Sequence, residues 1–168
     1  MNYKNIKVLL YSFSNYLFSI PIVYFGLTSF SKDELKADWQ PPGYVFGIVW
    51  PILYILFGII NIKTFTNKTI SDNVKNMLIK QSLREAIGQT LWLLVTSNFG
   101  KGRTFIQYFI GLFILGFLVN YAFTKRRPNL ALYDSTSFYL YIPYTLWIMF
   151  AFILNLQIVL KFIMKGKN

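Results

Sequence analysis

The side chains best suited to chemistry lie on three apolar segments, where their spacing puts each set on one side of a helix. In the first segment, Trp50, Tyr54 and Asn61 stand at positions i, i+4 and i+11, which share one helical face. The other two sets follow the same rule and comprise Glu85, Gln89, Trp92 and Thr96, and Tyr144, Trp147, Ala151 and Asn155. Lipid offers no partner to an amide, hydroxyl or carboxylate group, so all three faces are expected to point into a helix bundle. There they would form a pocket whose rings suit a flat, apolar, polycyclic ligand, with the amides and hydroxyls orienting it.

A simpler interpretation of the same three faces is packing. Amide side chains such as Gln89 and Asn155 can tie neighbouring helices together by hydrogen bonds, while tryptophan and tyrosine rings fill the space between them. The spacings alone favour packing over a ligand pocket, and the pocket remains the alternative.

Most catalytic and metal-binding chemistry is excluded by what the chain lacks. It contains no Cys and no His, which removes thiol nucleophiles, histidine bases, most zinc sites and the usual haem ligands. No two of its six acidic residues stand at a helical spacing within an apolar segment; they are Asp33, Glu34, Asp38, Asp72, Glu85 and Asp134. Without a carboxylate pair, an activating base or a glycine-rich phosphate loop, no catalytic residue and no metal site is predicted.

The composition indicates the environment in which these faces must be held. Of 168 residues, 55% are hydrophobic and only 14% are charged, a ratio far from that of soluble domains and typical of membrane proteins. Runs long enough to cross a bilayer, about 20 residues at the helical rise, occupy residues 8–30, 44–62, 83–99, 105–123 and 138–163. The sequence therefore predicts one domain, residues 1–168, that is an all-α, multi-pass integral membrane protein with a five-transmembrane-helix bundle.

The formal net charge of +11 is carried by lysines and arginines that flank the apolar runs. They gather before the first run, between the second and third, after the fourth and at the end of the chain, where lipid headgroups attract them. Membrane lipids are therefore expected partners, and nucleic acid is not, because no basic stripe coincides with a soluble fold that could present it. Lysines and arginines divide almost evenly between the two sides of the membrane, so the orientation stays open.

The connection of residues 31–43 is the most acidic between the runs, with three of the six acidic residues, and it also contains Trp39, Pro41 and Pro42. Two roles suit it equally. It is either a lid over the bundle, or an ordinary solvated loop in which the tryptophan anchors at the membrane interface and the prolines open the next helix.

Two long motifs in this order resemble those of the TspO/MBR family, whose members include translocator proteins, tryptophan-rich sensory proteins and peripheral-type benzodiazepine receptors. The first is WQPPGYVFGIVWPILYILFG, residues 39–58, and the second is YIPYTLWIMFAFILN, residues 141–155. A weaker similarity covers residues 89–92 and Arg103. Two departures accompany the resemblance: Gln89 and Leu93 stand where the family usually has Asn and then Ser or Thr.

The resemblance implies a five-helix membrane bundle, commonly dimeric, with a long loop between the first two helices. Family members bind porphyrins such as protoporphyrin IX, and some bind cholesterol or benzodiazepine-site ligands. By motif position the cavity would be lined by Trp50, Tyr54, Trp147, Ala151 and Asn155, with Tyr144, Trp92 and Gln89 on the same faces. Trp39, Pro41 and Pro42 would form its loop cover. The family's proposed sterol motif needs a tyrosine after Asn155, where this chain runs LQIVLKFIMKGKN, so sterol binding there is not expected.

Three functions are consistent with these features. The first is a membrane receptor or transport protein that binds a tetrapyrrole in an aromatic-lined cavity, needs no cofactor and forms a homodimer. The second is a light-dependent enzyme that degrades the bound porphyrin, in which Trp50 and Trp147 would act as redox partners. The third is a ligand-responsive sensory or scaffold protein. The dimer face stays open, because Gly111 and Gly116 have four residues between them rather than the three of the common small-residue contact.

Overall fold

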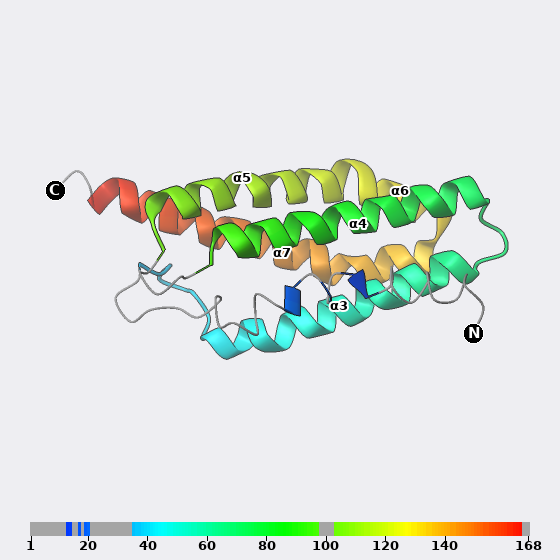
Figure 1. Cartoon of the computed structure of the whole chain (residues 1–168), viewed down its shortest axis with the longest axis horizontal. Helices are drawn as coiled ribbons and strands as arrows, with labels where there is room; N and C mark the ends of the chain where they lie inside the picture. The colour runs from blue at the N-terminus through cyan, green and yellow to red at the C-terminus, as the bar shows by residue number, and fades with distance from the viewer. Residues whose placement is uncertain (1–12, 15–16, 18, 21–34, 98–102, 166–168) are drawn as a thin grey trace.

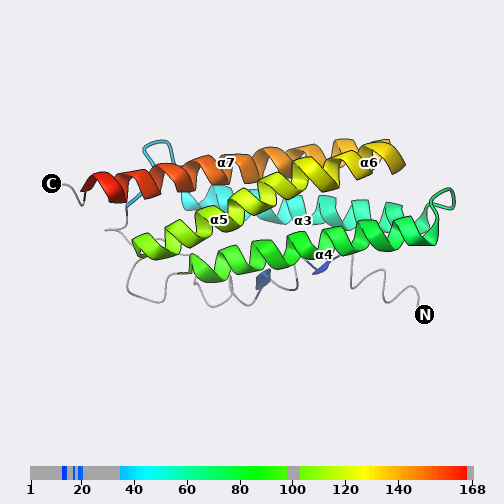
Figure 2. The ribbon, with the colours of Figure 1, turned by 90° about the horizontal axis from the view of Figure 1, so that it is seen from above.

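The computed structural model describes residues 13–14, 17, 19–20, 35–97 and 103–165. These residues form long helical segments that lie side by side along one axis (Figure 1). The segments are α3 (Gly43–Thr66), α4 (Asp72–Val95), the continuous run of α5 (Phe105–Tyr121), η1 (Ala122–Arg126) and α6 (Arg127–Tyr133), and α7 (Ser135–Lys165). α3 packs against α4 and α7. α5 packs against the same two helices and lies between them when the bundle is seen from above (Figure 2).

Three of these segments are long and apolar enough to cross a membrane, namely α3, the run Phe105–Tyr133, and α7. They contain the predicted spans 44–62, 105–123 and 138–163, which are thereby confirmed as helices. The protein is therefore an all-helical, multi-pass integral membrane protein over the part that the structure describes.

Two predicted boundaries are wrong. The third helix begins at Asp72 rather than near residue 83, because its first half is polar and a search for apolar runs does not register it. The fourth segment does not stop at Phe123 but continues through the π-helix η1 into α6. Pro128 stands in the first turn of α6, and the wider π turn before it accommodates a residue that lacks an N–H donor.

Most of the predicted first span, residues 8–30, and residues 31–34 of the loop lie outside the described residues. The expected total of five transmembrane helices is therefore not confirmed. Of that first segment, Ser19 is described, and its hydroxyl lies 2.9 Å from the Tyr54 hydroxyl on α3.

Local hydrogen bonds fix where two of the helices begin. Thr104 accepts from the backbone N–H of Gln107, and the Gln107 side chain accepts from the backbone N–H of Thr104, so α5 opens on a complete capping box. Asp134 precedes α7 and accepts from both the backbone N–H and the hydroxyl of Ser137, at 3.1 and 2.7 Å. Each cap satisfies donors that the first helical turn leaves without partners.

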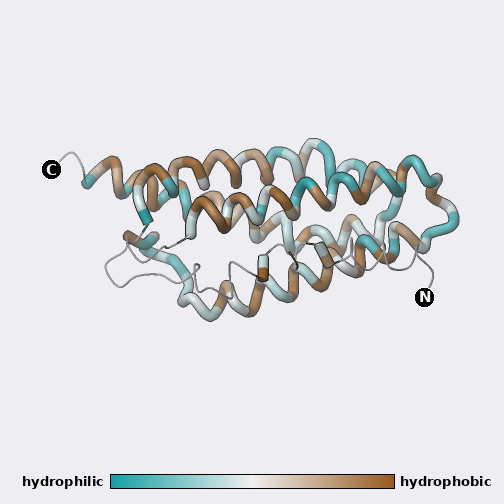
Figure 3. Tube along the Cα trace, in the orientation of Figure 1, coloured by the Kyte–Doolittle hydropathy of each residue, from teal (hydrophilic) through white to brown (hydrophobic). Residues whose placement is uncertain are grey.

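Close approach between α4 and α5 depends on glycine. A Cβ atom at Gly88 would lie 2.7 Å from Cδ2 of Leu118, and one at Gly111 would lie 2.9 Å from Cγ2 of Thr96. Gly111 thus faces α4 of its own chain. Figure 3 shows hydrophilic residues concentrated at the end of the bundle that holds the first half of α4, while hydrophobic residues dominate the middle.

Candidate functional site

All four tryptophans of the chain take part in one connected series of ring contacts, which we call the aromatic cluster; it comprises Trp39, Phe46, Trp50, Tyr54, Trp92, Trp147 and Phe150. Trp50 on α3 is its centre. Its ring centroid lies 6.4 Å from that of Trp147 on α7, 6.2 Å from that of Trp92 on α4 and 5.6 Å from that of Tyr54. Three helices that are distant in sequence thereby bring their rings to one place, within the range of favourable aromatic contacts.

Residues 35–42 connect the aromatic cluster to the end of α7. The Trp39 ring packs edge-on against Phe150, with centroids 5.4 Å apart, and Phe150 stacks on Trp147 at 5.0 Å. Pro42 caps α3 in an extended conformation, so the two prolines lead directly from this loop into the helix, as one interpretation of the sequence expected.

Polar contacts hold the same loop on α7. Lys161 donates to the backbone carbonyl of Lys36 at 2.9 Å and forms an ion pair with Asp38. Gln157 donates to the other carboxylate oxygen of Asp38 at 2.8 Å. The described part of the predicted lid therefore rests on α7 next to the aromatic cluster, held by two side chains that are one helical turn apart.

Two indole groups of the aromatic cluster are unusual in their hydrogen bonding. The Nε1 atoms of Trp92 and Trp147 are buried, and neither finds an acceptor among the described residues. A buried donor without a partner costs about 1–3 kcal/mol, so an acceptor that reached either group would be stabilising. Trp92 lies beside Gly111 of α5, where a Cβ atom would be in ordinary contact with the indole, 3.5 Å from Nε1.

The predicted amide residues form contacts between helices. Asn155 donates to the backbone carbonyl of Tyr108 at 2.7 Å, and Gln89 donates to the Tyr144 hydroxyl at 2.9 Å. Ala151 is buried in the hydrophobic core. The NH2 groups of Asn155 and Gln89 therefore tie helices together, as the packing interpretation predicts. The buried Oε1 atom of Gln89 has no donor within the described part of the chain.

Tyr144 belongs to a second set of rings beside the aromatic cluster. Its centroid lies 4.6 Å from that of Phe57 and 5.2 Å from that of Tyr141. All three are almost completely buried. Of the predicted ligand-binding residues, the structure thus brings Trp50, Tyr54, Trp92 and Trp147 into one cluster and places Tyr144 in a neighbouring one.

A buried charge network beyond Tyr141 was missed by the sequence analysis. Glu85 of α4 and Arg126 of η1 are completely buried, with Arg126 Nε 3.7 Å from Glu85 Oε2. The Tyr141 hydroxyl donates to Glu85 Oε1, and Arg126 donates to the backbone carbonyl of Leu78. From its position in the sequence, Arg126 is expected only as a charge that flanks a span. Glu85 is the residue from which this network could be predicted, because a carboxylate on the inward face of a membrane helix requires a cationic partner.

Two comparisons with known proteins bear on the identity of the chain. A search of curated proteins gives no match, but a protein-family model matches most of the chain. The family model described as the TspO/MBR family matches residues 17–160, which include every residue of the aromatic cluster and both motifs on which the resemblance was based. The chain therefore belongs to the TspO/MBR family.

Proposed function

We propose that this membrane protein, which is of the receptor or transport type, binds a porphyrin-like ligand at the aromatic cluster. The observation that supports this most directly is the convergence of all four tryptophans on one place, with two buried indole donors that lack acceptors among the described residues. Aromatic faces supply apolar contact to a flat ring system, and the indole N–H groups supply hydrogen bonds to its carboxylate or carbonyl oxygens.

Ligand entry requires the cluster to open. The rings of Trp50 and Trp147 meet edge to face, with 6.4 Å between centroids and an interplanar angle of 87°, so they are already in contact. A flat ligand must displace one of them or bind where Trp39 now covers Phe150. In this proposal the loop of residues 35–42 moves away from α7 when the ligand enters.

A porphyrin titration with two double variants tests the proposal. Replacing Trp50 and Trp147 together by leucine removes the central rings, and replacing the lipid-facing Phe113 and Phe117 by leucine is the matched control. Binding of protoporphyrin IX is followed by the shift of the porphyrin absorption band, because the first variant lacks two of the tryptophans whose fluorescence would otherwise report it. We expect saturable binding in the wild type and control and its loss in the tryptophan variant, with helical circular dichroism unchanged in both.

Survival of saturable binding in the tryptophan variant would contradict the proposal. Absorbance that rises without saturation in every protein would mean that the porphyrin only partitions into detergent, which also contradicts it.

Light-dependent porphyrin degradation is the second candidate, and the contacts of Trp50 with both Trp92 and Trp147 favour it. An indole next to a photoexcited porphyrin can transfer one electron to it, and a neighbouring indole can reduce the indole radical cation that this leaves. Cleavage of the porphyrin ring is a net oxidation, so dissolved dioxygen would have to supply the oxygen atoms and accept the electrons. Illumination of the loaded protein, followed by chromatography, separates this candidate from simple binding. A new chromophore that is absent in the tryptophan variant supports degradation, and an unchanged pigment rules it out.

A further inference from the structure

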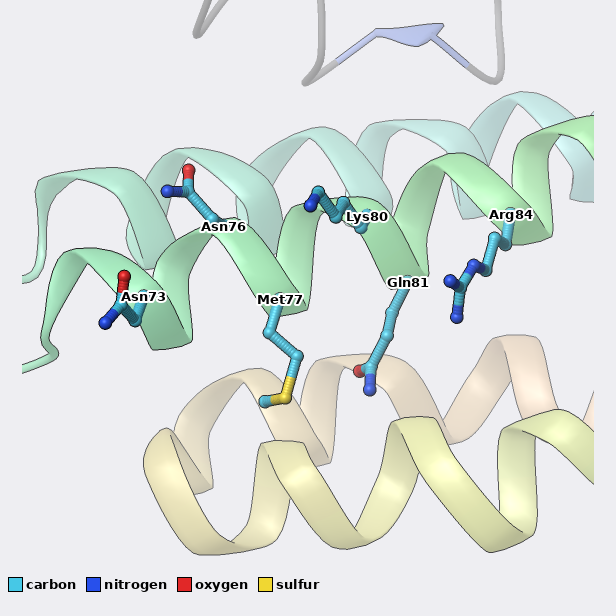
Figure 4. Close-up of a pocket in the computed structure, with 6 residues that line it drawn as sticks. All are labelled: Asn73, Asn76, Met77, Lys80, Gln81 and Arg84. Carbon is cyan, nitrogen blue, oxygen red and sulfur yellow. The ribbon is translucent and has the colours of Figure 1, made fainter.

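Two pockets on the outer surface of α4 meet at Arg84. The first has a volume of about 370 Å³ and is lined by six residues of α4 (Figure 4): Asn73, Asn76, Met77, Lys80, Gln81 and Arg84. The second has a volume of about 380 Å³, lies between α4 and α5, and is lined by Arg84, Ile87, Gly88, Leu91, Phe113, Ile114 and Phe117. Apart from Arg84 the second lining is entirely apolar, so a polar pocket passes directly into an apolar groove.

The position of Arg84 along the membrane normal follows from a contact between helices. Asn61, near the end of the apolar run of α3, donates to Ser82 on α4 at 3.0 Å. Lys63 follows on α3 within the next turn, so Arg84 lies close to the level at which α3 leaves the apolar part of the bilayer. From there Leu91 lies about 10 Å deeper, at 1.5 Å per residue along α4. The polar pocket is therefore at headgroup depth and the groove at acyl-chain depth.

The charge of the polar pocket selects an anion. Lys80 and Arg84 are one helical turn apart on the same face, both are exposed, and neither forms an ion pair with another described residue, unlike Lys75, Arg126 and Lys161. No acidic residue lines the pocket, and its three amides provide hydrogen bonds to phosphate oxygens. A cationic choline or ethanolamine group in this pocket would face two positive charges with no carboxylate to balance them.

We propose that this surface binds one anionic phospholipid, whose phosphate contacts Lys80 and Arg84 and whose acyl chain lies in the groove between α4 and α5. Gly88 shapes that groove, since the absence of a side chain lets Leu118 of α5 approach α4 closely. Ile87, Leu91, Phe113 and Phe117, all exposed, provide the walls against which the chain packs. The soluble headgroup alone would gain nothing from this groove, which is why the proposed ligand is a lipid rather than free phosphate.

The test measures phosphatidylglycerol binding to the full chain in neutral detergent, by native mass spectrometry and by the shift in thermal unfolding temperature. The variant Lys80→Gln/Arg84→Gln removes both charges and keeps polar side chains. A lysine or arginine near the membrane surface contributes about 1 kcal/mol to the binding of an anionic lipid. Loss of both is therefore expected to weaken the apparent affinity about thirtyfold. The matched control is Lys68→Gln/Lys125→Gln, which removes two exposed charges on the same side of the membrane and is expected to lose little affinity.

Two further probes separate this site from general attraction. Phosphatidylcholine is expected to bind at least tenfold more weakly than phosphatidylglycerol, and glycerophosphoglycerol, the headgroup without its chains, is expected not to compete. Equal binding of the two lipids, equal losses in the variant and its control, or full competition by the soluble headgroup would each overturn the proposal. Circular dichroism of both variants shows whether they retain the helical fold.

Discussion

The buried pair of Glu85 and Arg126 is best tested by removing its members singly and together. Replacing Arg126 by methionine leaves the Glu85 carboxylate in the bundle with only the Tyr141 hydroxyl as a donor. Both charged side chains are completely buried, and breaking such a pair by removing one partner costs about 3–5 kcal/mol. We expect the single variant to lose stability by that amount, and Glu85→Gln to lose a similar amount because it leaves the guanidinium unpaired.

The double variant, Glu85→Gln with Arg126→Met, shows whether the two buried charges stabilise each other or act independently. It removes both charges, so no unpaired ion remains in the bundle, and neutral replacements of a buried pair are often close to neutral in stability. We expect the double variant to be more stable than either single variant, which corresponds to a coupling energy of about 3 kcal/mol or more.

Arg127→Met is the matched control for Arg126→Met. Arg127 follows directly in the chain, but its guanidinium lies over the rings of Phe123 and Phe138, 4.8 and 5.3 Å from their centroids, and contacts of this kind are worth about 0.5–2 kcal/mol. Unfolding of the detergent-purified proteins by a denaturing detergent, followed by circular dichroism, measures all four variants. Losses that add up in the double variant, or an equal loss in the control, would refute the reasoning.

Two smaller perturbations test the packing and the loop. Gly88→Ala is expected to destabilise the protein by about 1–3 kcal/mol, because the new Cβ would lie 2.7 Å from Leu118 Cδ2. The control Gly47→Ala should be neutral or stabilising, because its new Cβ would have nothing within 4 Å. Similar unfolding midpoints for the two variants would be evidence against the close packing of α4 on α5. Asp38→Asn removes the ion pair that holds residues 35–42 on α7, so trypsin is expected to cleave after Lys36 several times faster, at little cost in global stability. An unchanged cleavage rate would mean that the ion pair does not hold the loop.

The family and three of the helices were predictable from the sequence because both depend on local information. A motif such as residues 39–58 is recognised without knowing its surroundings, and an apolar run of membrane-spanning length must satisfy its own backbone hydrogen bonds as a helix. The same periodicity puts Trp50 and Tyr54 on one face, and the structure places their rings in contact. The polar start of α4 was not predictable in this way, since it carries no apolar signal.

Contacts between helices required the tertiary structure, because periodicity fixes which residues share a face and not the rotation or register of one helix against another. Asn155 was predicted to line a cavity, and in the bundle its amide donates to the backbone of α5. By sequence position Arg126 is one of several charges at the end of a span, and only the folded bundle buries it beside Glu85 and the Leu78 carbonyl of α4. The sequence by itself thus determined the three apolar helices and which of their residues share a face, whereas the packing of α3, α4, α5 and α7 determined which residues meet.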